Sequence, residues 1–148
     1  MSPILPDGQY KIFNLGTGLL VGRRAAEDLS FRPKGIFTLD PDVWTIENTG
    51  DGTFKLQAFG APVGERDGLL WAFLLNSDQA NAGEWRIVSI PQMGKDCYLI
   101  TKPDLETGWV ADKEPNEQIK VKPLIVLPSF PPKYPTSEVF VIKPAHPE

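Results

Sequence analysis

The side chains that most often carry out catalysis or bind metals are scarce in this sequence. His146 is its only histidine and Cys97 its only cysteine. Serine and cysteine nucleophiles need a positioned histidine, and zinc sites need several histidine or cysteine ligands. Asp40 and Asp42 could act as a pair of glycosidase carboxylates, but aspartates on either side of a proline are typical of a turn. The sequence therefore predicts no enzymatic activity, no cofactor and no metal site.

The four tryptophans suggest sugar binding as one function, because exposed aromatic rings can stack on sugars. Trp44 and Trp85 lie in segments that alternate apolar and polar residues, which predicts that they pack in a core. Trp71 and Trp109 are less clearly internal. The Gln-x-Trp signature of ricin-type sugar-binding proteins is absent at Trp44 and at Trp85. Carbohydrate binding is kept as an alternative function.

Two stretches between predicted strands are long enough to present residues to a partner. The first runs from Arg23 to Lys34 and places Leu29 among charged and polar residues. The second runs from Leu127 to Ser137 and has Lys133 near its tip. Its prolines restrict the backbone to extended conformations, which lowers the entropic cost of presentation.

Composition restricts the class of protein. The 148 residues fit one domain, and the 13 glycines and 15 prolines favour short strands joined by turns. The formal net charge of −4 argues against a nucleic-acid partner. A single cysteine cannot form an intrachain disulfide, and no apolar run reaches the length of a membrane-spanning helix. Residues 1–7 lack the pattern of a signal peptide, so we expect a cytoplasmic location.

Short strand-like segments recur at a fixed interval, and the first segment of each unit returns after 44 residues. We therefore predict an all-β fold, a β-trefoil of twelve strands in which three four-stranded repeats form a pseudo-threefold barrel. One domain would span residues 1–148, with repeats at roughly 8–50, 51–94 and 95–144. The equivalent positions are Tyr10, Phe54 and Tyr98 in the first segments, Val21, Val63 and Val110 in the second, and Trp44, Trp85 and Phe140 in the last.

The order and spacing of several segments resemble a known family. The segments are Asp7 to Asn14, Val21 to Arg23, Glu27 to Ser30 and Pro33 to Phe37. Together they are similar to the β-trefoil serine protease inhibitors of mushrooms and, more distantly, to the mycocypins, which inhibit cysteine proteases. The similarity runs along the whole chain, and its first forty residues carry the specific pattern.

The resemblance implies that the loop between the second and third strands enters the protease cleft. Trypsin-inhibiting members resemble Glu-Asp-Arg-Ser at the positions of Glu27 to Ser30, whereas this chain has Leu29 in place of the basic residue. A large apolar residue fits the primary pocket of chymotrypsin-like or subtilisin-like enzymes. The predicted protease-binding residues are Glu27, Asp28, Leu29, Ser30 and Phe31.

Other positions could contribute to inhibition. Lys133 is a second candidate, directed at trypsin-like enzymes, and Arg23 or Arg24 would take the place of Leu29 if the first loop is centred earlier. Asn14, in the neighbouring first turn, is a candidate to brace the loop backbone.

The alternative of mycocypin-type inhibition would use other loops, such as Asn14 to Gly18 and Asp40 to Val43. The main prediction remains a monomeric, non-enzymatic serine protease inhibitor with a role in fungal defence. We expect no nucleic-acid or membrane partner and no cofactor.

Overall fold

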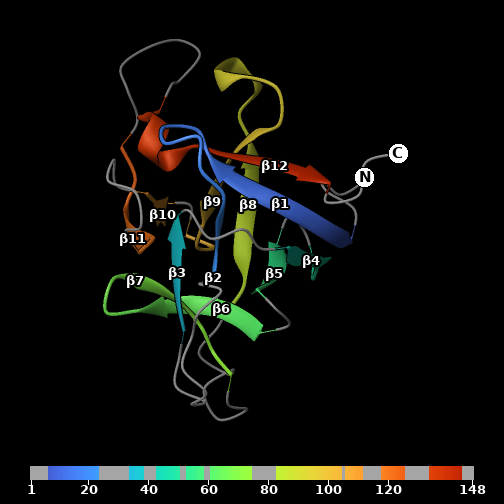
Figure 1. Cartoon of the computed structure of the whole chain (residues 1–148). Helices are drawn as coiled ribbons and strands as arrows, with labels where there is room; N and C mark the ends of the chain where they lie inside the picture. The colour runs from blue at the N-terminus through green and yellow to red at the C-terminus, as the bar shows by residue number, and fades with distance from the viewer. Residues whose placement is uncertain are drawn as a thin grey trace.

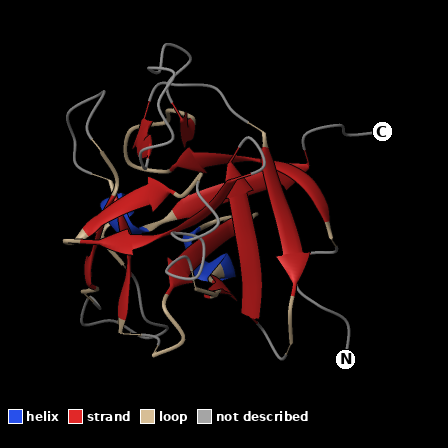
Figure 2. Ribbon diagram, turned by 90° about the horizontal axis from the view of Figure 1, so that it is seen from below, coloured by secondary structure: helices blue, strands red, loops and turns tan. Residues whose placement is uncertain are grey.

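The structure is a computed structural model of the chain. It describes residues 7–23, 34–38, 43–50, 53–58, 61–74, 83–104, 106–111, 118–125 and 134–144. Within these ranges the chain forms twelve β-strands and two short 3₁₀ helices (Figure 1, Figure 2). The elements are β1 (Gly8–Asn14), β2 (Val21–Arg23), β3 (Lys34–Thr38), β4 (Trp44–Asn48), β5 (Thr53–Ala58), β6 (Ala61–Arg66), β7 (Leu69–Ala72), β8 (Trp85–Ser89), η1 (Pro91–Met93), β9 (Cys97–Thr101), β10 (Thr107–Val110), β11 (Lys120–Pro123), η2 (Thr136–Glu138) and β12 (Phe140–Pro144).

Alternating exposure explains why these segments form strands. In β1 the side chains of Tyr10, Ile12 and Asn14 are buried, while Gln9 and Lys11 are exposed. β4 and β5 follow the same two-residue period. Successive side chains of a strand point to opposite faces. Each of these strands therefore turns one face toward the core and the other toward solvent.

The β6–β7 hairpin shows how a local sequence signal sets the register. Arg66 is opposite Leu69, so only Asp67 and Gly68 form the turn. Both have positive φ angles, 57° for Asp67 and 77° for Gly68. A two-residue hairpin turn with two positive φ angles favours Asp-Gly, because aspartate tolerates this region and glycine has no Cβ to clash.

The strand pairing closes on itself within the described residues. β1 pairs with β4 and β12, β5 with β4 and β8, and β9 with β8 and β12, so these six strands form a ring. The hairpins β2–β3, β6–β7 and β10–β11 extend from this ring, and β7 also pairs with β3 and β11. A larger closed path of nine strands runs from β11 to β7 and returns through the β7–β11 pair. The prediction of an all-β, closed barrel is confirmed.

Four aromatic rings meet in the main core. Trp109 is fully buried, and its ring centroid lies 5.4 Å from that of Trp44, 5.6 Å from that of Trp85 and 5.9 Å from that of Phe140. The prediction that Trp44 and Trp85 pack in the core is confirmed. Trp109, which the sequence left less clearly internal, contacts all three of the other rings.

Two of these tryptophans use their ring nitrogens in the same way. Nε1 of Trp44 donates to the carbonyl of Val21 at 2.7 Å, and Nε1 of Trp85 donates to the carbonyl of Val63 at 3.1 Å. Such an acceptor matters because a buried indole N–H left unpaired costs about 1–3 kcal/mol. In contrast, Nε1 of Trp109 has no hydrogen-bond partner in the described part of the chain. The third position that the sequence predicts to be equivalent is Phe140, whose side chain has no N–H group to donate.

A smaller apolar cluster is formed by residues of β8, β9 and β12 and of segments beside η1 and η2. η1, η2 and the β1–β2 turn all lie at this end of the fold (Figure 1). The buried members of the cluster are Ile90, Cys97, Leu99 and Val139. Half-buried side chains cover it, namely Leu15, Val88, Met93, Leu124, Tyr134 and Val141. This end of the molecule therefore has its own packing, distinct from the aromatic core.

Candidate functional site

The first predicted loop connects β2 to β3, and the structure describes the strand ends that hold it. Arg23 and Lys34, which the sequence placed in the loop, belong to β2 and β3. Arg23 is opposite Ile36, and the connecting segment is residues 24–33. We call β2 together with residues 34–36 the first stem. The predicted residues in the connecting segment lie outside the described residues: Arg24, Glu27, Asp28, Leu29, Ser30 and Phe31.

Hydrogen bonds from neighbouring elements hold the first stem. The carbonyl of Ile36 accepts a hydrogen bond from the amide of Ile119 at 2.7 Å. The carbonyl of Val21 accepts the indole N–H of Trp44 at 2.7 Å. The first two residues of β3 also pair with β7, and Lys34 is only 6% exposed. The described backbone on both sides of residues 24–33 is therefore held by hydrogen bonds to neighbouring elements.

The β6–β7 hairpin pairs with the start of β3 and is stabilised by the carboxylate of Glu65. Oε1 of Glu65 accepts a hydrogen bond from Nζ of Lys102 at 2.8 Å, and Oε2 accepts one from the amide of Gly68 at 2.9 Å. The hydrogen bond from Lys102, followed by that from Gly68, lowers the pKa of Glu65. Since Lys102 directly follows β9, this carboxylate links the hairpin to the barrel.

Asn14 links the β1–β2 turn to η2. Its side chain is fully buried, and Nδ2 lies 3.2 Å from the carbonyl oxygen of Ser137, 3.3 Å from that of Val139 and 3.4 Å from that of Thr136. Its Oδ1 accepts a hydrogen bond from the amide of Thr17 at 3.0 Å. One amide side chain thus connects the turn with the segment that leads into β12.

The predicted role of Asn14 concerned the loop between β2 and β3. That loop lies outside the described residues, so this role stays a prediction. Among the described residues the side chain of Asn14 contacts its own turn and η2.

Glu138 holds the ends of the second predicted loop together. It belongs to η2 and is only 3% exposed. Its Oε2 accepts a hydrogen bond from the amide of Ile125 at 2.8 Å, whereas Oε1 has no hydrogen-bond partner in the described part of the chain. We call residues 124–125 together with η2 the second stem. The segment between them contains Lys133, which lies outside the described residues.

Burial raises the pKa of Glu138. The hydrogen bond from Ile125 and the positive charge of Lys122 act in the opposite direction but are smaller causes. A carboxylate with one unpartnered oxygen in a buried place is costly to ionise. The second stem therefore contains a group that favours its neutral form more than an exposed glutamate does.

The two stems lie apart in the molecule. η2 lies beside the β1–β2 turn, while β2 runs away from that turn and β3 begins at the far end of β2 (Figure 1). The described residues that flank the two predicted loops therefore lie at different ends of the fold.

A family model described as peptidase inhibitor I66 matches residues 1–144. The chain belongs to this family of peptidase inhibitors. A curated relative, a serine protease inhibitor from Lentinula edodes, is 38% identical over 143 residues, which cover 93% of this chain and 96% of the relative. The solved structure of a proteinase inhibitor from Coprinopsis cinerea is 33% identical with a TM-score of 0.86, over 95% of this chain and 99% of that chain. The resemblance found in the sequence is confirmed.

More distant structures share the fold alone with this I66 inhibitor. A designed threefold-symmetric protein, ThreeFoil, is 15% identical with a TM-score of 0.67 over 93% of this chain and 99% of its own. A ricin B-like lectin from Macrolepiota procera, solved with lactose, is 17% identical with a TM-score of 0.68 over 97% of this chain and 99% of its own. In this chain Trp44, Trp85 and Trp109 are buried, and Nε1 of Trp71 donates to the carbonyl of Arg66.

The remaining candidates for chemistry are inert or lie outside the described residues. Cys97 is buried, and burial raises the pKa of its thiol. His146, Asp40 and Asp42 are not among the described residues. Within the described ranges no group of histidine, cysteine and acidic residues could hold a metal ion. None of the helices found there has the length and apolar character needed to cross a membrane. The I66 family consists of peptidase inhibitors, not enzymes.

Glu138 was not among the residues of this I66 inhibitor that were predicted from the sequence. Phe140 and Ile142, which follow it at intervals of two positions, are buried side chains of β12. Side chains two apart along an extended chain share a face. Glu138 itself lies in the 3₁₀ helix η2, so this strand rule does not extend to it and no local pattern indicated that it is buried.

Proposed function

We propose that this chain inhibits serine proteases by placing the segment between β2 and β3, residues 24–33, in the protease cleft like a substrate. The family match over residues 1–144 is the observation that carries the proposal. The Lentinula edodes relative, which is named a serine protease inhibitor, indicates the class of protease. The fixed first stem supports the proposal, because a preorganised loop loses less entropy on binding. Complexes of this kind bury about 800 Å² on each partner.

Leu29 is the proposed specificity residue, flanked by Glu27, Asp28, Ser30 and Phe31. A leucine side chain buried in an apolar pocket contributes about 1.5–3 kcal/mol of transfer free energy. In a trypsin-like pocket it would leave the buried carboxylate of the enzyme without a partner. Chymotrypsin-like and subtilisin-like proteases are therefore the proposed targets of this segment.

A second inhibitory position at Lys133 is also proposed, with trypsin-like enzymes as its targets. The second stem supports it, because Glu138 and Asn14 hold the chain on both sides of the segment that contains Lys133. Arg23 and Arg24 remain the alternative source of any trypsin inhibition.

The proposed scaffold is a single, monomeric β-trefoil with repeats at roughly 8–50, 51–94 and 95–144. The six-stranded ring with its hairpins is the pairing that this architecture requires. The indole-to-carbonyl hydrogen bonds from Trp44 to Val21 and from Trp85 to Val63 join positions that the sequence repeat makes equivalent. These two observations support three repeats related by a pseudo-threefold axis.

The test is a set of inhibition constants against chymotrypsin, subtilisin, trypsin and papain. We expect Leu29→Asp to weaken inhibition of chymotrypsin and subtilisin by about 100-fold or more, as for a central contact residue. Leu29→Arg should move inhibition toward trypsin, and Lys133→Ala should remove any trypsin inhibition of the unmodified chain. Lys55→Ala, at an exposed position of β5, is the control.

Each part of the proposal fails on a different result. Unchanged inhibition by Leu29→Asp would show that another residue occupies the specificity pocket. Inhibition of papain without inhibition of any serine protease would overturn the proposed class and favour the cysteine-protease alternative.

A further inference from the structure

Two lysines face each other across the pair of strands that joins the ends of the fold. Lys11 of β1 and Lys143 of β12 are opposite residues in the antiparallel register, and both are exposed. Opposite side chains have Cβ atoms about 5 Å apart, and like charges in this arrangement are destabilising. Within the described ranges neither ammonium group forms an ion pair with a carboxylate.

The same barrel places opposite charges together elsewhere. On β4 and β5 the exposed Glu47 is opposite the exposed Lys55, an arrangement that favours pairing. The Lys11–Lys143 pair therefore differs from its counterpart in a neighbouring strand pair. An anion bound between the two ammonium groups would offset their repulsion.

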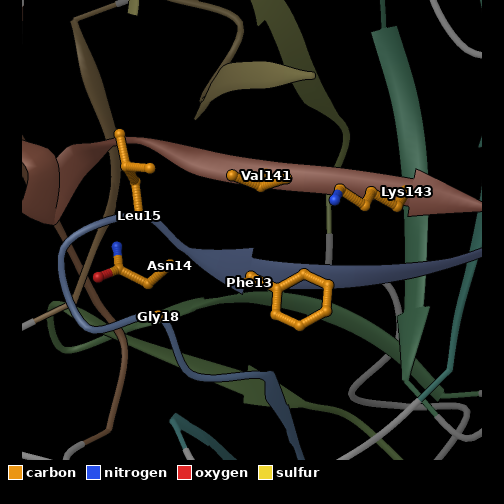
Figure 3. A pocket seen from close by; sticks show the side chains of 6 residues that line it. All are labelled: Phe13, Asn14, Leu15, Gly18, Val141 and Lys143. Carbon is orange, nitrogen blue, oxygen red and sulfur yellow. The ribbon is translucent and has the colours of Figure 1, made fainter. Parts of the chain in front are cut away.

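A hollow adjoins one member of this pair, Lys143 (Figure 3). It has a volume of about 230 Å³ and is lined by Phe13, Asn14, Leu15, Gly18, Val141 and Lys143. The half-buried Phe13 and Val141 are opposite each other, two residues along from the lysine pair and on the same outer face. The side chain of Lys143 lies along β12 with its nitrogen toward Val141 (Figure 3). Apolar and cationic groups thus border one space.

The rim of the hollow at the β1–β2 turn is open. Gly18 has a φ of +72°, and a Cβ atom placed there would meet nothing within 4 Å. The polar atoms of Asn14 are already bonded to η2 and to Thr17, so they are not free to bind a ligand. Recognition therefore depends on the apolar side chains and on Lys143, with Lys11 opposite it on β1.

We propose that this hollow binds a small apolar monocarboxylate. Its body would pack on Phe13, Leu15 and Val141, and its carboxylate would lie between Lys143 and Lys11. Whole drug-sized ligands need pockets of about 300–1,000 Å³, so a hollow of about 230 Å³ suits a body no larger than one aromatic ring. The site uses neither segment that we propose to inhibit serine proteases, so it is independent of that inhibition. Its rim includes residues of the Asn14 to Gly18 loop, which only the cysteine-protease alternative would use.

The probe is 3-phenylpropionate, titrated into the full-length, ¹⁵N-labelled protein and followed by amide chemical shifts. Ligands of this size bind with dissociation constants on the order of 1–10 mM. We expect saturable shifts at the amides of Phe13, Leu15, Gly18, Val141 and Lys143. Acetate has the charge without the apolar body, and 3-phenylpropionamide has the body without the charge, so both should bind at least about fivefold more weakly.

The variants Lys143→Gln and Lys11→Gln should each weaken binding of 3-phenylpropionate by about threefold, and the double variant by about tenfold. Lys55→Gln is the matched control, because it removes an exposed strand lysine that faces a carboxylate, and it should leave binding unchanged. Equal binding of the amide and the acid would overturn the proposal. So would the absence of saturable shifts at these amides up to about 20 mM, or an equal loss of affinity in Lys55→Gln. Unchanged protease inhibition in Lys143→Gln would confirm that the site is separate from the inhibitory segments.

Discussion

The two stems hold long connecting segments by different means. In the first stem, backbone pairing with β7 and the hydrogen bonds of Val21 and Ile36 fix the strands. In the second stem, the buried side chains of Asn14 and Glu138 bind backbone groups of distant segments. In the first stem many similar backbone hydrogen bonds share in holding the chain. In the second stem the chain is held by a few atoms of two side chains. Single substitutions should therefore affect the second stem more strongly.

A glutamate supports each stem, and the pKa values of the two are shifted in opposite directions. Glu65 lies in the β6–β7 hairpin, which pairs with the first stem through β7; it accepts hydrogen bonds with both oxygens and has a lowered pKa. Glu138, in the second stem, uses one oxygen, and burial raises its pKa. The same residue type is thus stabilising when ionised in one region and costly when ionised in the other.

The largest expected effect is that of Asn14→Leu. The substitution keeps a similar volume but removes the Nδ2 donor from the carbonyls of Ser137 and Val139, and it leaves the amide of Thr17 without its acceptor in a buried place. The two carbonyls keep the backbone hydrogen bonds that they accept from Ala111 and Leu15. We expect the free energy of unfolding to fall by about 3 kcal/mol, measured by urea denaturation at pH 7. Gln9→Leu, at an exposed position of the same strand, is the control and should change it by less than about 0.5 kcal/mol. A loss below about 1 kcal/mol for Asn14→Leu would remove the contrast between the stems.

Trp44→Phe tests the first stem, because it removes the indole N–H that binds the carbonyl of Val21. We expect a loss of about 1.5–2 kcal/mol in the free energy of unfolding. Trp85→Phe should cost a similar amount, since its indole N–H binds Val63 in the same way. Trp71→Phe is the control, because Trp71 is only half-buried, and it should cost less than about 1 kcal/mol. If Trp44→Phe costs more than Asn14→Leu, the first stem depends on single contacts more than the second.

The scaffold could be predicted because its signals are local and repeated. The return of Tyr10 at Phe54 and Tyr98 needs only strand periodicity and counting. The dipeptide Asp67-Gly68 is an equally local signal, because Asp-Gly favours a two-residue hairpin turn. The twelve strands of the described residues follow from such signals. Their ends were less well predicted, since Arg23 and Lys34 are in strands and not in the loop.

The second stem could not be predicted in the same way, because its contacts join residues far apart in the chain. Asn14 and Ser137 are separated by 123 positions. The amide of an asparagine does not specify which distant carbonyls it will bind. Glu138 was overlooked because acidic residues are seldom fully buried, and because it lies in η2, where the two-residue period of a strand does not apply. The predicted residues from Glu27 to Phe31 and Lys133 lie outside the described residues, so their roles remain predictions.

Glu138→Gln tests whether ionisation of the carboxylate in the second stem opposes folding. The pKa of Glu138 is raised above its ordinary value of 4.5, so its ionisation opposes folding. Its contribution is most favourable at acid pH and is lost as pH rises from 4.5 through the folded-state pKa. The free energy of unfolding of Glu138→Gln, relative to the unmodified protein, should therefore increase between pH 4 and pH 7. Urea denaturation at several pH values measures this difference. A difference that does not change with pH would show that Glu138 is no more costly to ionise than an exposed glutamate.

The smallest expected effect is that of Glu65→Gln, and its pH dependence should be opposite. The pKa of Glu65 is lowered from its ordinary value of 4.5, so its ionised form stabilises the β6–β7 hairpin above that pH. This contribution is lost as pH falls from 4.5 through the folded-state pKa. Because the partly exposed pair with Lys102 is screened by solvent, we expect Glu65→Gln to cost less than about 1 kcal/mol at pH 7. The cost should shrink toward pH 3, and Lys102→Gln should reproduce the same trend, since it removes the main cause of the lowered pKa. If Glu65→Gln and Glu138→Gln change with pH in the same direction, the burial of one carboxylate and the pairing of the other do not govern their contributions.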